Sequence, residues 1–192
     1  MAVAVPLIRR WTRMEYLKMA DAGVFAPGER VELIEGEVIV MTPQKSPHAV
    51  AGGLVEDALR AAFGPGFHVR SQRPLNLGPD SEPEPDAAVV RGTLRDYVDA
   101  HPTMAVLIVE VSDTTLAFDR ERKGPLYAKA GIPEYWILNL IDRVLEVHRD
   151  PGPLPEDPSR SGYRPTQRLG RSETVTPLAA PSATIRVADL LP

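Results

Sequence analysis

A run of apolar residues that ends in a single acid constrains this chain more than any other feature. Residues 104–109 are Met, Ala, Val, Leu, Ile and Val, and Glu110 follows them. A run without polar side chains suits a central strand covered on both faces better than a half-exposed strand. An ionised carboxylate at the end of a buried strand is costly unless it faces a cleft, an ion-pair partner or a metal. Glu110 is therefore a candidate functional residue.

A second acid opens another short apolar strand. Asp86 directly precedes residues 87–90, which are Ala, Ala, Val and Val. Because strand side chains alternate with period two, Asp86 shares a face with Ala88, and Glu110 shares a face with Ser112. If the two strands are neighbours, both carboxylates converge on one oxygen-rich site. Such a site suits a hard divalent cation, either Mg²⁺ or Mn²⁺.

The chain then continues with a charged segment, a helix and a third apolar strand. Residues 119–123 read Asp-Arg-Glu-Arg-Lys, and residues 135–138 are apolar. Because Gly124-Pro125 would break a long helix, we expect the helix to begin near Arg122. Lys123 would then lie at the start of that helix. The expected order is strand, crossover, strand, helix and strand.

These residues resemble the Uma-type family, a bacterial branch of the PD-(D/E)XK nuclease superfamily, over about residues 32–163. The resemblance is carried by Asp86, Glu110, Lys123, Tyr127, Gly131 and the run Glu134-Tyr135-Trp136. It implies a restriction-endonuclease-like core in which Asp86 and Glu110 hold a divalent metal together with the backbone carbonyl of Val111. It also implies a lysine that orients or activates the attacking water. The position two after Glu110 is Ser112, so the resemblance assigns this lysine role to Lys123.

The N-terminal part predicts a helix and a hairpin. Thr12 and Glu15 fit a capping box for a helix over residues 13–20. Residues 31–34 and 37–41 flank Glu35-Gly36, which is typical of a two-residue hairpin turn. In that register Glu32 could point into a cleft, as an outer metal contact or a water-orienting acid. The alternative interpretation is an ordinary acid on an edge hairpin.

Two further segments carry candidate contacts. Ser46-Pro47 predicts a helix over residues 48–63, with His48 in its first turn. A phosphate-binding role and a structural hydrogen bond are both open for this histidine. Residues 67–77 alternate well enough for one long strand. Four arginines could supply a local basic groove, although solvated edge charges are the alternative: Arg70, Arg73, Arg120 and Arg122. Gln72 could line the same groove.

The remaining segments predict secondary elements around the core. Residues 93–100 read as a short helix, and residues 135–140 and 144–148 as a second hairpin. The Pro- and Gly-rich residues 150–165 predict a long irregular loop. Short strands are expected near Val175 and Ile185, before a terminal turn. The expected fold is α/β, a restriction-endonuclease-like mixed sheet flanked by helices, with an extra N-terminal hairpin and C-terminal strands.

Length and composition bound the fold and the location. The 192 residues, 43% hydrophobic, are enough for one domain, which we expect to span residues 1–192. The chain has no cysteine and no apolar stretch of membrane-spanning length, and residues 1–7 lack the features of a signal peptide. We therefore expect a cytoplasmic protein without a membrane partner. A net charge of -4 argues against indiscriminate binding to nucleic acid but allows a local basic groove.

The predicted function is metal-dependent hydrolysis of phosphodiester bonds in nucleic acid, with DNA as the expected substrate. Asp86, Glu110, Lys123 and Glu32 are the candidate catalytic residues, and a homodimer is expected because cutting a duplex takes two active sites. The motif HExxH of zinc hydrolases, the phosphate-binding loops GxGxxG and GxxxxGK[ST], and the motif GxSxG of serine hydrolases are absent, which argues against those classes of enzyme. The alternative is a catalytically silent nuclease-fold module that binds nucleic acid or serves in protein assembly.

Overall fold

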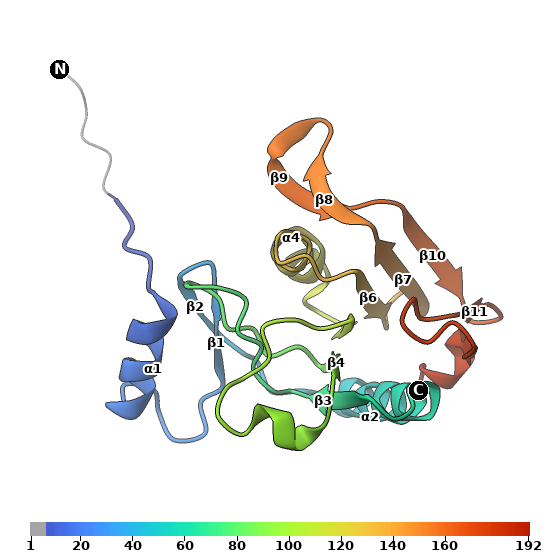
Figure 1. Ribbon diagram of the computed structural model, residues 1–192, viewed down its shortest axis with the longest axis horizontal. Helices are drawn as coiled ribbons and strands as arrows, with labels where there is room; N and C mark the ends of the chain where they lie inside the picture. The colour runs from blue at the N-terminus through green and yellow to red at the C-terminus, as the bar shows by residue number, and fades with distance from the viewer. Residues whose placement is uncertain (1–6) are drawn as a thin grey trace.

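The buried run that ends in Glu110 forms the centre of a six-stranded mixed sheet in the computed structural model, which describes residues 7–192 (Figure 1). The strands lie in the order β10 (Thr166–Gly170), β7 (Val144–Arg149), β6 (Glu134–Asn139), β5 (Leu107–Ser112), β4 (Ala87–Arg91) and β3 (Phe67–Ser71). Only β5 and β6 run parallel. All six residues of β5 are buried, as expected for a covered strand. Glu110 lies within β5 rather than at its end, because the strand begins at Leu107 and continues to Ser112.

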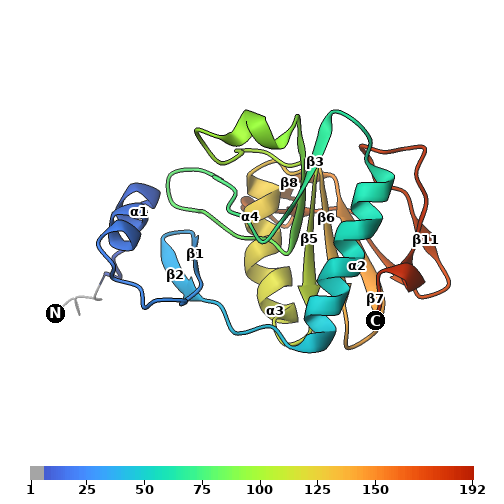
Figure 2. The same ribbon diagram turned by 90° about the horizontal axis from the view of Figure 1, so that it is seen from below.

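Helices cover both faces of this sheet, which confirms the predicted fold class (Figure 2). On one face, α2 (Ser46–Ala62) packs Val55 and Leu59 against residues such as Val109. On the other face, α4 (Gly124–Lys129) packs Leu126 among residues that include Ile108. Strand residues alternate between these two clusters. Glu110 shares the parity of Ile108, so its side chain faces α4.

The helix before β6 is longer than predicted. A turn of helix α3 (Leu116–Phe118) leads directly into a π-helical turn η2 (Asp119–Lys123) and then into α4. The backbone N–H of Gly124 donates to the carbonyl of Asp119, five residues earlier. This wider turn relieves the clash of the Pro125 ring with the preceding turn, so the proline does not end the helix. The predicted start near Arg122 is therefore wrong, and Lys123 lies in the middle of the helical segment.

The helix and the hairpin expected over residues 13–41 form as predicted. Thr12 and Glu15 form the capping box of α1 (Arg13–Asp21). The hairpin β1 (Val31–Ile34) and β2 (Glu37–Val40) pairs Glu32 with Ile39 in the expected register. Its turn needs positive φ angles, 48° at Glu35 and 78° at Gly36, which glycine adopts without strain.

One strand prediction and one loop prediction are corrected. The strand predicted over residues 67–77 ends at Ser71, because Gln72 has a φ of 49° and Pro74 lacks a donor. The predicted irregular loop at 150–165 contains a hairpin of β8 (Pro151–Leu154) and β9 (Asp157–Tyr163), which contacts α4. Its prolines at 151 and 153 recur with period two, so their missing donors fall on one side of the strand.

The remaining elements are short. The segment predicted as a helix over 93–100 is a 3₁₀ turn, η1 (Leu94–Tyr97). The predicted C-terminal strands are present as β11 (Thr174–Val175) and β12 (Ile185–Arg186), followed by η3 (Val187–Asp189). Among residues 7–192, no helix has the length and apolarity needed to cross a membrane. The prediction that residues 1–7 are not a signal peptide stays a prediction, because residues 1–6 lie outside the described residues.

Candidate functional site

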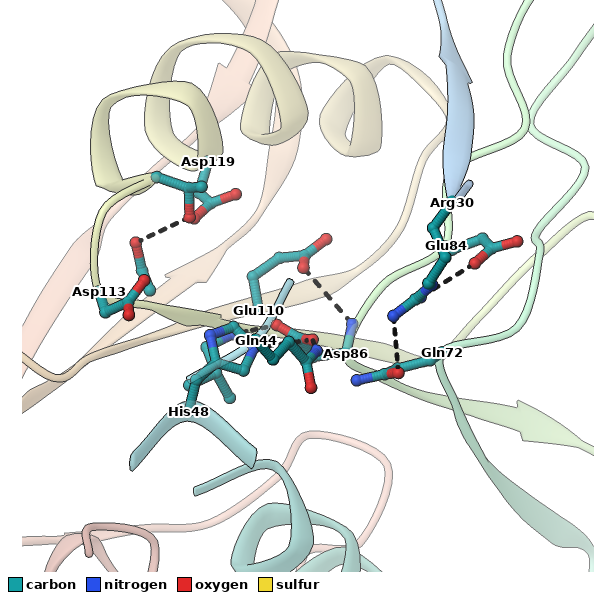
Figure 3. Close-up of polar contacts among 12 residues, drawn as sticks. Arg30, Gln44, His48, Gln72, Glu84, Asp86, Glu110, Asp113 and Asp119 are labelled. Atoms are coloured by element: carbon teal, nitrogen blue, oxygen red, sulfur yellow. Dashed lines mark hydrogen bonds and ion pairs between the residues drawn. The ribbon is translucent and has the colours of Figure 1, made fainter. Parts of the chain in front are cut away.

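Asp86 lies directly opposite Glu110 across two neighbouring strands. In the antiparallel register of β4 and β5, Ala87 pairs with Val109, so the preceding residue of β4 faces the following residue of β5. The backbone N–H of Asp86 donates to Oε2 of Glu110 at 3.4 Å (Figure 3). The N–H of Val111 donates to Oδ2 of Asp86 at 2.8 Å. The strand order and alternation that the sequence predicted thus bring both carboxylates to the same place.

Lys123 reaches the same acids from the π-helical turn. Its Nζ lies 3.1 Å from Oε1 of Glu110 and 3.2 Å from Oε1 of Glu32. Burial alone would lower the pKa of Lys123, but the charges of Glu110 and Glu32 outweigh burial and hold that pKa above its ordinary value. The ammonium therefore stays charged. Four residues selected from the sequence, Asp86, Glu110, Lys123 and Glu32, form one contiguous cluster.

Two buried donors share one oxygen of Glu110. The hydroxyl of Tyr127 donates to Oε1 at 2.7 Å, beside the Lys123 contact. Lys123 and Tyr127 are four residues apart on one helical segment, so they point to the same side. Burial raises the pKa of Glu110 to about 8, although the charge of Lys123 opposes this shift. The i, i+4 spacing was the sequence signal that could have identified Tyr127 as a partner of Glu110.

Asp86 is held from the other side by the segment that leads into α2. Gln44 Nε2 donates to Oδ1 of Asp86 at 3.1 Å, and Nε2 of His48 lies 3.1 Å from the same oxygen (Figure 3). Burial lowers the pKa of His48, but the hydrogen bond and charge of Asp86 raise it more, so the net shift is upward. The structure thus places His48 beside an acid of the cluster. Gln44 had no sequence signal, because it stands in a linker without a pattern.

A cavity of about 420 Å³ opens onto this cluster. Its wall includes the four predicted residues, with Val111, Gln44 and His48. The β2–α2 linker, the β5–α3 loop and the helical segment that follows this loop also line the cavity, with Met41, Pro43, Asp113, Thr115, Phe118 and Asp119 among their residues. Ser112, two residues after Glu110, has its hydroxyl 3.5 Å from that of Thr115.

The oxygen donors at this cavity fit a hard divalent cation. The N–H of Val111 points to Asp86, and the two backbone groups of a strand residue point to the same side, so its carbonyl faces that side too. A carboxylate has about four lone-pair sites, so Asp86 and Glu110 keep acceptor capacity beyond the bonds described above. Within residues 7–192 no three His, Asp or Glu side chains form a metal-holding group. Two carboxylates completed by a carbonyl and water suit Mg²⁺.

Comparisons with known proteins identify similar sequences and folds. A profile of the family described as "Putative restriction endonuclease" (Uma2) matches residues 13–188. The crystal structure described as "a putative nuclease belonging to DUF820", from Anabaena variabilis ATCC 29413, superposes with a TM-score of 0.70 at 16% sequence identity. That match covers 93% of this chain and 96% of the other, and at this identity it bears on the fold alone. No curated protein matches the chain significantly.

Proposed function

The chain belongs to the family described as "Putative restriction endonuclease", and from this premise we propose that it hydrolyses phosphodiester bonds of DNA in a reaction that depends on a divalent metal. One observation carries the proposal. Asp86 and Glu110 face each other in register on adjacent strands, and the Nζ of Lys123 lies 3.1 Å from Glu110. Two acids and a charged amine at the wall of one cavity match the requirements of phosphoryl-transfer chemistry.

Asp86, Glu110 and the carbonyl of Val111 would hold the cation. When bound, Mg²⁺ or Mn²⁺ would supply Lewis-acid chemistry that favours attack of water on the phosphate. Lys123 has three N–H donors, of which two are directed at Glu110 and Glu32. The third is left for a water or a phosphate oxygen in the cavity, where its charge offsets the negative charge that develops during attack.

The surrounding residues fix these groups in place. Tyr127 holds Oε1 of Glu110, which leaves Oε2, with only a 3.4 Å contact, as the freer oxygen. Gln44 and His48 hold Oδ1 of Asp86, and Val111 N–H holds Oδ2. Glu32 fixes Lys123, and its own Oε2 accepts from the N–H of Glu84 at 3.1 Å. Preorganisation of this kind keeps reacting groups from rearranging during the reaction.

The proposal extends to the assembly and its setting. We take the chain to be one nuclease-fold unit with one catalytic cluster, acting in the cytoplasm. Cleavage of both strands of a duplex then needs two copies, for which a homodimer is the simplest arrangement. Light scattering coupled to size-exclusion chromatography measures this directly, and a monomer at all concentrations would restrict the activity to single strands or nicking.

The proposal is tested by cleavage of labelled DNA, both single-stranded and duplex, and of RNA, with Mg²⁺, Mn²⁺ or EDTA. The wild type is expected to cleave DNA only with a metal, and Glu110→Gln is expected to lose cleavage. Glu146→Gln is the matched control, since Glu146 is a buried acid of the same sheet face that is bonded to Arg120 outside the cavity. Thermal melts establish that both variants fold.

The outcome also decides between the proposal and a catalytically silent module. A silent module would bind nucleic acid without cutting any of the substrates, whichever metal is present. Cleavage that survives equally in Glu110→Gln and Glu146→Gln would mean that another site, or a contaminant, is responsible.

A further inference from the structure

Arg70 is a buried cation that has no acidic partner among residues 7–192. Of the buried side chains among residues 7–192, two carry a positive charge, Lys123 and Arg70, each 4% exposed. Lys123 faces two carboxylates, as described above. In the same described part of the chain, no carboxylate lies within ion-pair distance of Arg70, and its Nε has no hydrogen-bond partner. A buried charge without a counter-charge is costly, so this arrangement calls for an explanation.

The surroundings of Arg70 increase this cost. Its Nη2 donates to the carbonyl of Pro74 at 3.2 Å and lies 3.5 Å from Nδ1 of His101. Burial lowers the pKa of the guanidinium, and the charge of nearby Arg73 lowers it further. The guanidinium carbon lies over the ring of Tyr97, 5.6 Å from its centroid, which offers only a weak cation–π contact. The site therefore attracts an anion.

Two arginines of the expected basic groove are already engaged by acids. Arg120 donates through Nε and Nη2 to Glu146, and Arg122 lies 2.7 Å from Glu37. These two arginines, expected from the sequence to form a basic groove together with Arg70 and Arg73, are thus neutralised by the protein itself. The free positive charge of this group remains at the β3 edge.

The sheet register relates this edge to the catalytic cluster. Arg70 pairs with Ala88 on β4, two residues beyond the position of Asp86. The side chains of Arg70 and Asp86 lie on the same face of the sheet as the side chain of Glu110. Two strand residues span about 7 Å, which is about two nucleotide steps of stacked DNA at about 3.4 Å each. A strand whose scissile phosphate lies at Asp86 can therefore present a neighbouring phosphate at the β3 edge.

We propose that Arg70, together with Arg73, binds a backbone phosphate of the nucleic acid about two nucleotides from the bond that is cut. The inference rests on the proposed function for the position of the scissile bond. Arg73 and His101 are exposed and form the approach to the buried guanidinium. We assign to His101 the tautomer in which Nδ1 accepts from Arg70 and Nε2 carries the ring proton. The Nε2–H group is then a second donor for the anion. The phosphate supplies the counter-charge that the protein lacks.

The test measures binding of a short fluorescein-labelled DNA by anisotropy in EDTA, over a series of salt concentrations. The variants are Arg70→Met and Arg73→Gln. Arg171→Gln is the matched control, because Arg171 is exposed and follows β10, at the opposite edge of the sheet from β3 (Figure 1). Loss of one phosphate contact reduces the slope of log affinity against log salt by about one. Arg70→Met is expected to bind about tenfold more weakly.

Arg70→Met also has a readout that a purely structural arginine would not give. Because it removes an uncompensated buried charge, its melting temperature without DNA should equal or exceed that of the wild type, and DNA should stabilise it less. Should this variant fail to fold, the exposed Arg73→Gln decides the outcome. Wild-type slopes in the β3-edge variants, or an equal loss in Arg171→Gln, would overturn the inference.

Failure of this inference is distinguishable from failure of the proposed function. Metal-dependent cleavage with unchanged slopes in both β3-edge variants overturns the phosphate site alone. The expected loss of slope, in a protein that never cleaves, supports the phosphate site and overturns the nuclease proposal.

Discussion

The hydroxyl of Tyr127 donates a 2.7 Å hydrogen bond to Oε1 of Glu110, and both side chains are buried beneath the candidate site. In Tyr127→Phe, Glu110 keeps only Lys123 on this oxygen. We expect the rate of single-turnover cleavage to fall about tenfold, the equivalent of one net hydrogen bond.

The fold of Tyr127→Phe should survive, because its ring packs edge-on against Tyr135 with centroids 5.1 Å apart. Affinity for DNA should stay near that of the wild type, since the hydroxyl positions Glu110 rather than binding substrate. A cleavage rate equal to that of the wild type would show that this hydrogen bond does not position Glu110 for the reaction.

The raised pKa of Glu110 makes stability depend on pH in a predictable direction. Its pKa rises from an ordinary 4.5 to about 8 in the folded protein, so the folded state holds the proton more tightly than the unfolded chain. The contribution of this proton to the free energy of unfolding is complete below pH 4.5 and is lost as the pH rises through about 8. Glu110→Gln cannot ionise, so its stability relative to the wild type should increase across that window.

Equilibrium denaturation of the wild type and Glu110→Gln in EDTA, at several pH values, measures this difference. Glu146→Gln serves as the comparison, because Arg120 and Asn139 lower the pKa of Glu146 despite burial. The stability of Glu146→Gln relative to the wild type should therefore decrease as the pH rises. A constant stability difference between Glu110→Gln and wild type over the whole range would mean that Glu110 titrates like an ordinary glutamate.

The β1–β2 turn provides a test of the N-terminal hairpin that carries Glu32. A Cβ at Gly36 would lie 2.7 Å from the Cβ of Arg10, and its φ of 78° disfavours any side chain. Gly36→Ala should therefore lower the free energy of unfolding by about 1–2 kcal/mol or more. Gly53→Ala is the matched control within α2, where a Cβ meets nothing within 4 Å, and it should stabilise by about 0.5–1 kcal/mol. Equal effects of the two substitutions in urea denaturation would contradict the described turn.

The sequence predicted the parts of the fold that rest on local signals. The capping box at Thr12, the turn at Glu35-Gly36 and the buried run before Glu110 each have a residue pattern that fixes the local backbone. Period-two alternation was enough to predict that Asp86 and Glu110 would converge once their strands were neighbours. The family resemblance then added Lys123, which the structure brings to Glu110.

Features that depend on tertiary context were missed. The π-helical turn before Pro125 has no local pattern, because its widened geometry is stabilised by packing and by Tyr135, whose hydroxyl donates to the Asp119 carbonyl at 3.1 Å. The β8–β9 hairpin is rich in proline and lacks apolar alternation, so it reads as a loop. The isolation of Arg70 could not be predicted either, since a sequence does not show which arginines find an acid.

The most direct test of the central claim is the effect of a divalent cation on DNA affinity. Fluorescence anisotropy at fixed ionic strength, with Ca²⁺ in place of Mg²⁺ to limit cleavage, compares the wild type with Asp86→Asn combined with Glu110→Gln. Asp86 and Glu110 would hold the ion, whose charge would offset the repulsion between these acids and the scissile phosphate, so wild-type affinity should rise on its addition. The rise should disappear in the double variant. An unchanged rise in the double variant would contradict the claim that Asp86 and Glu110 hold the metal.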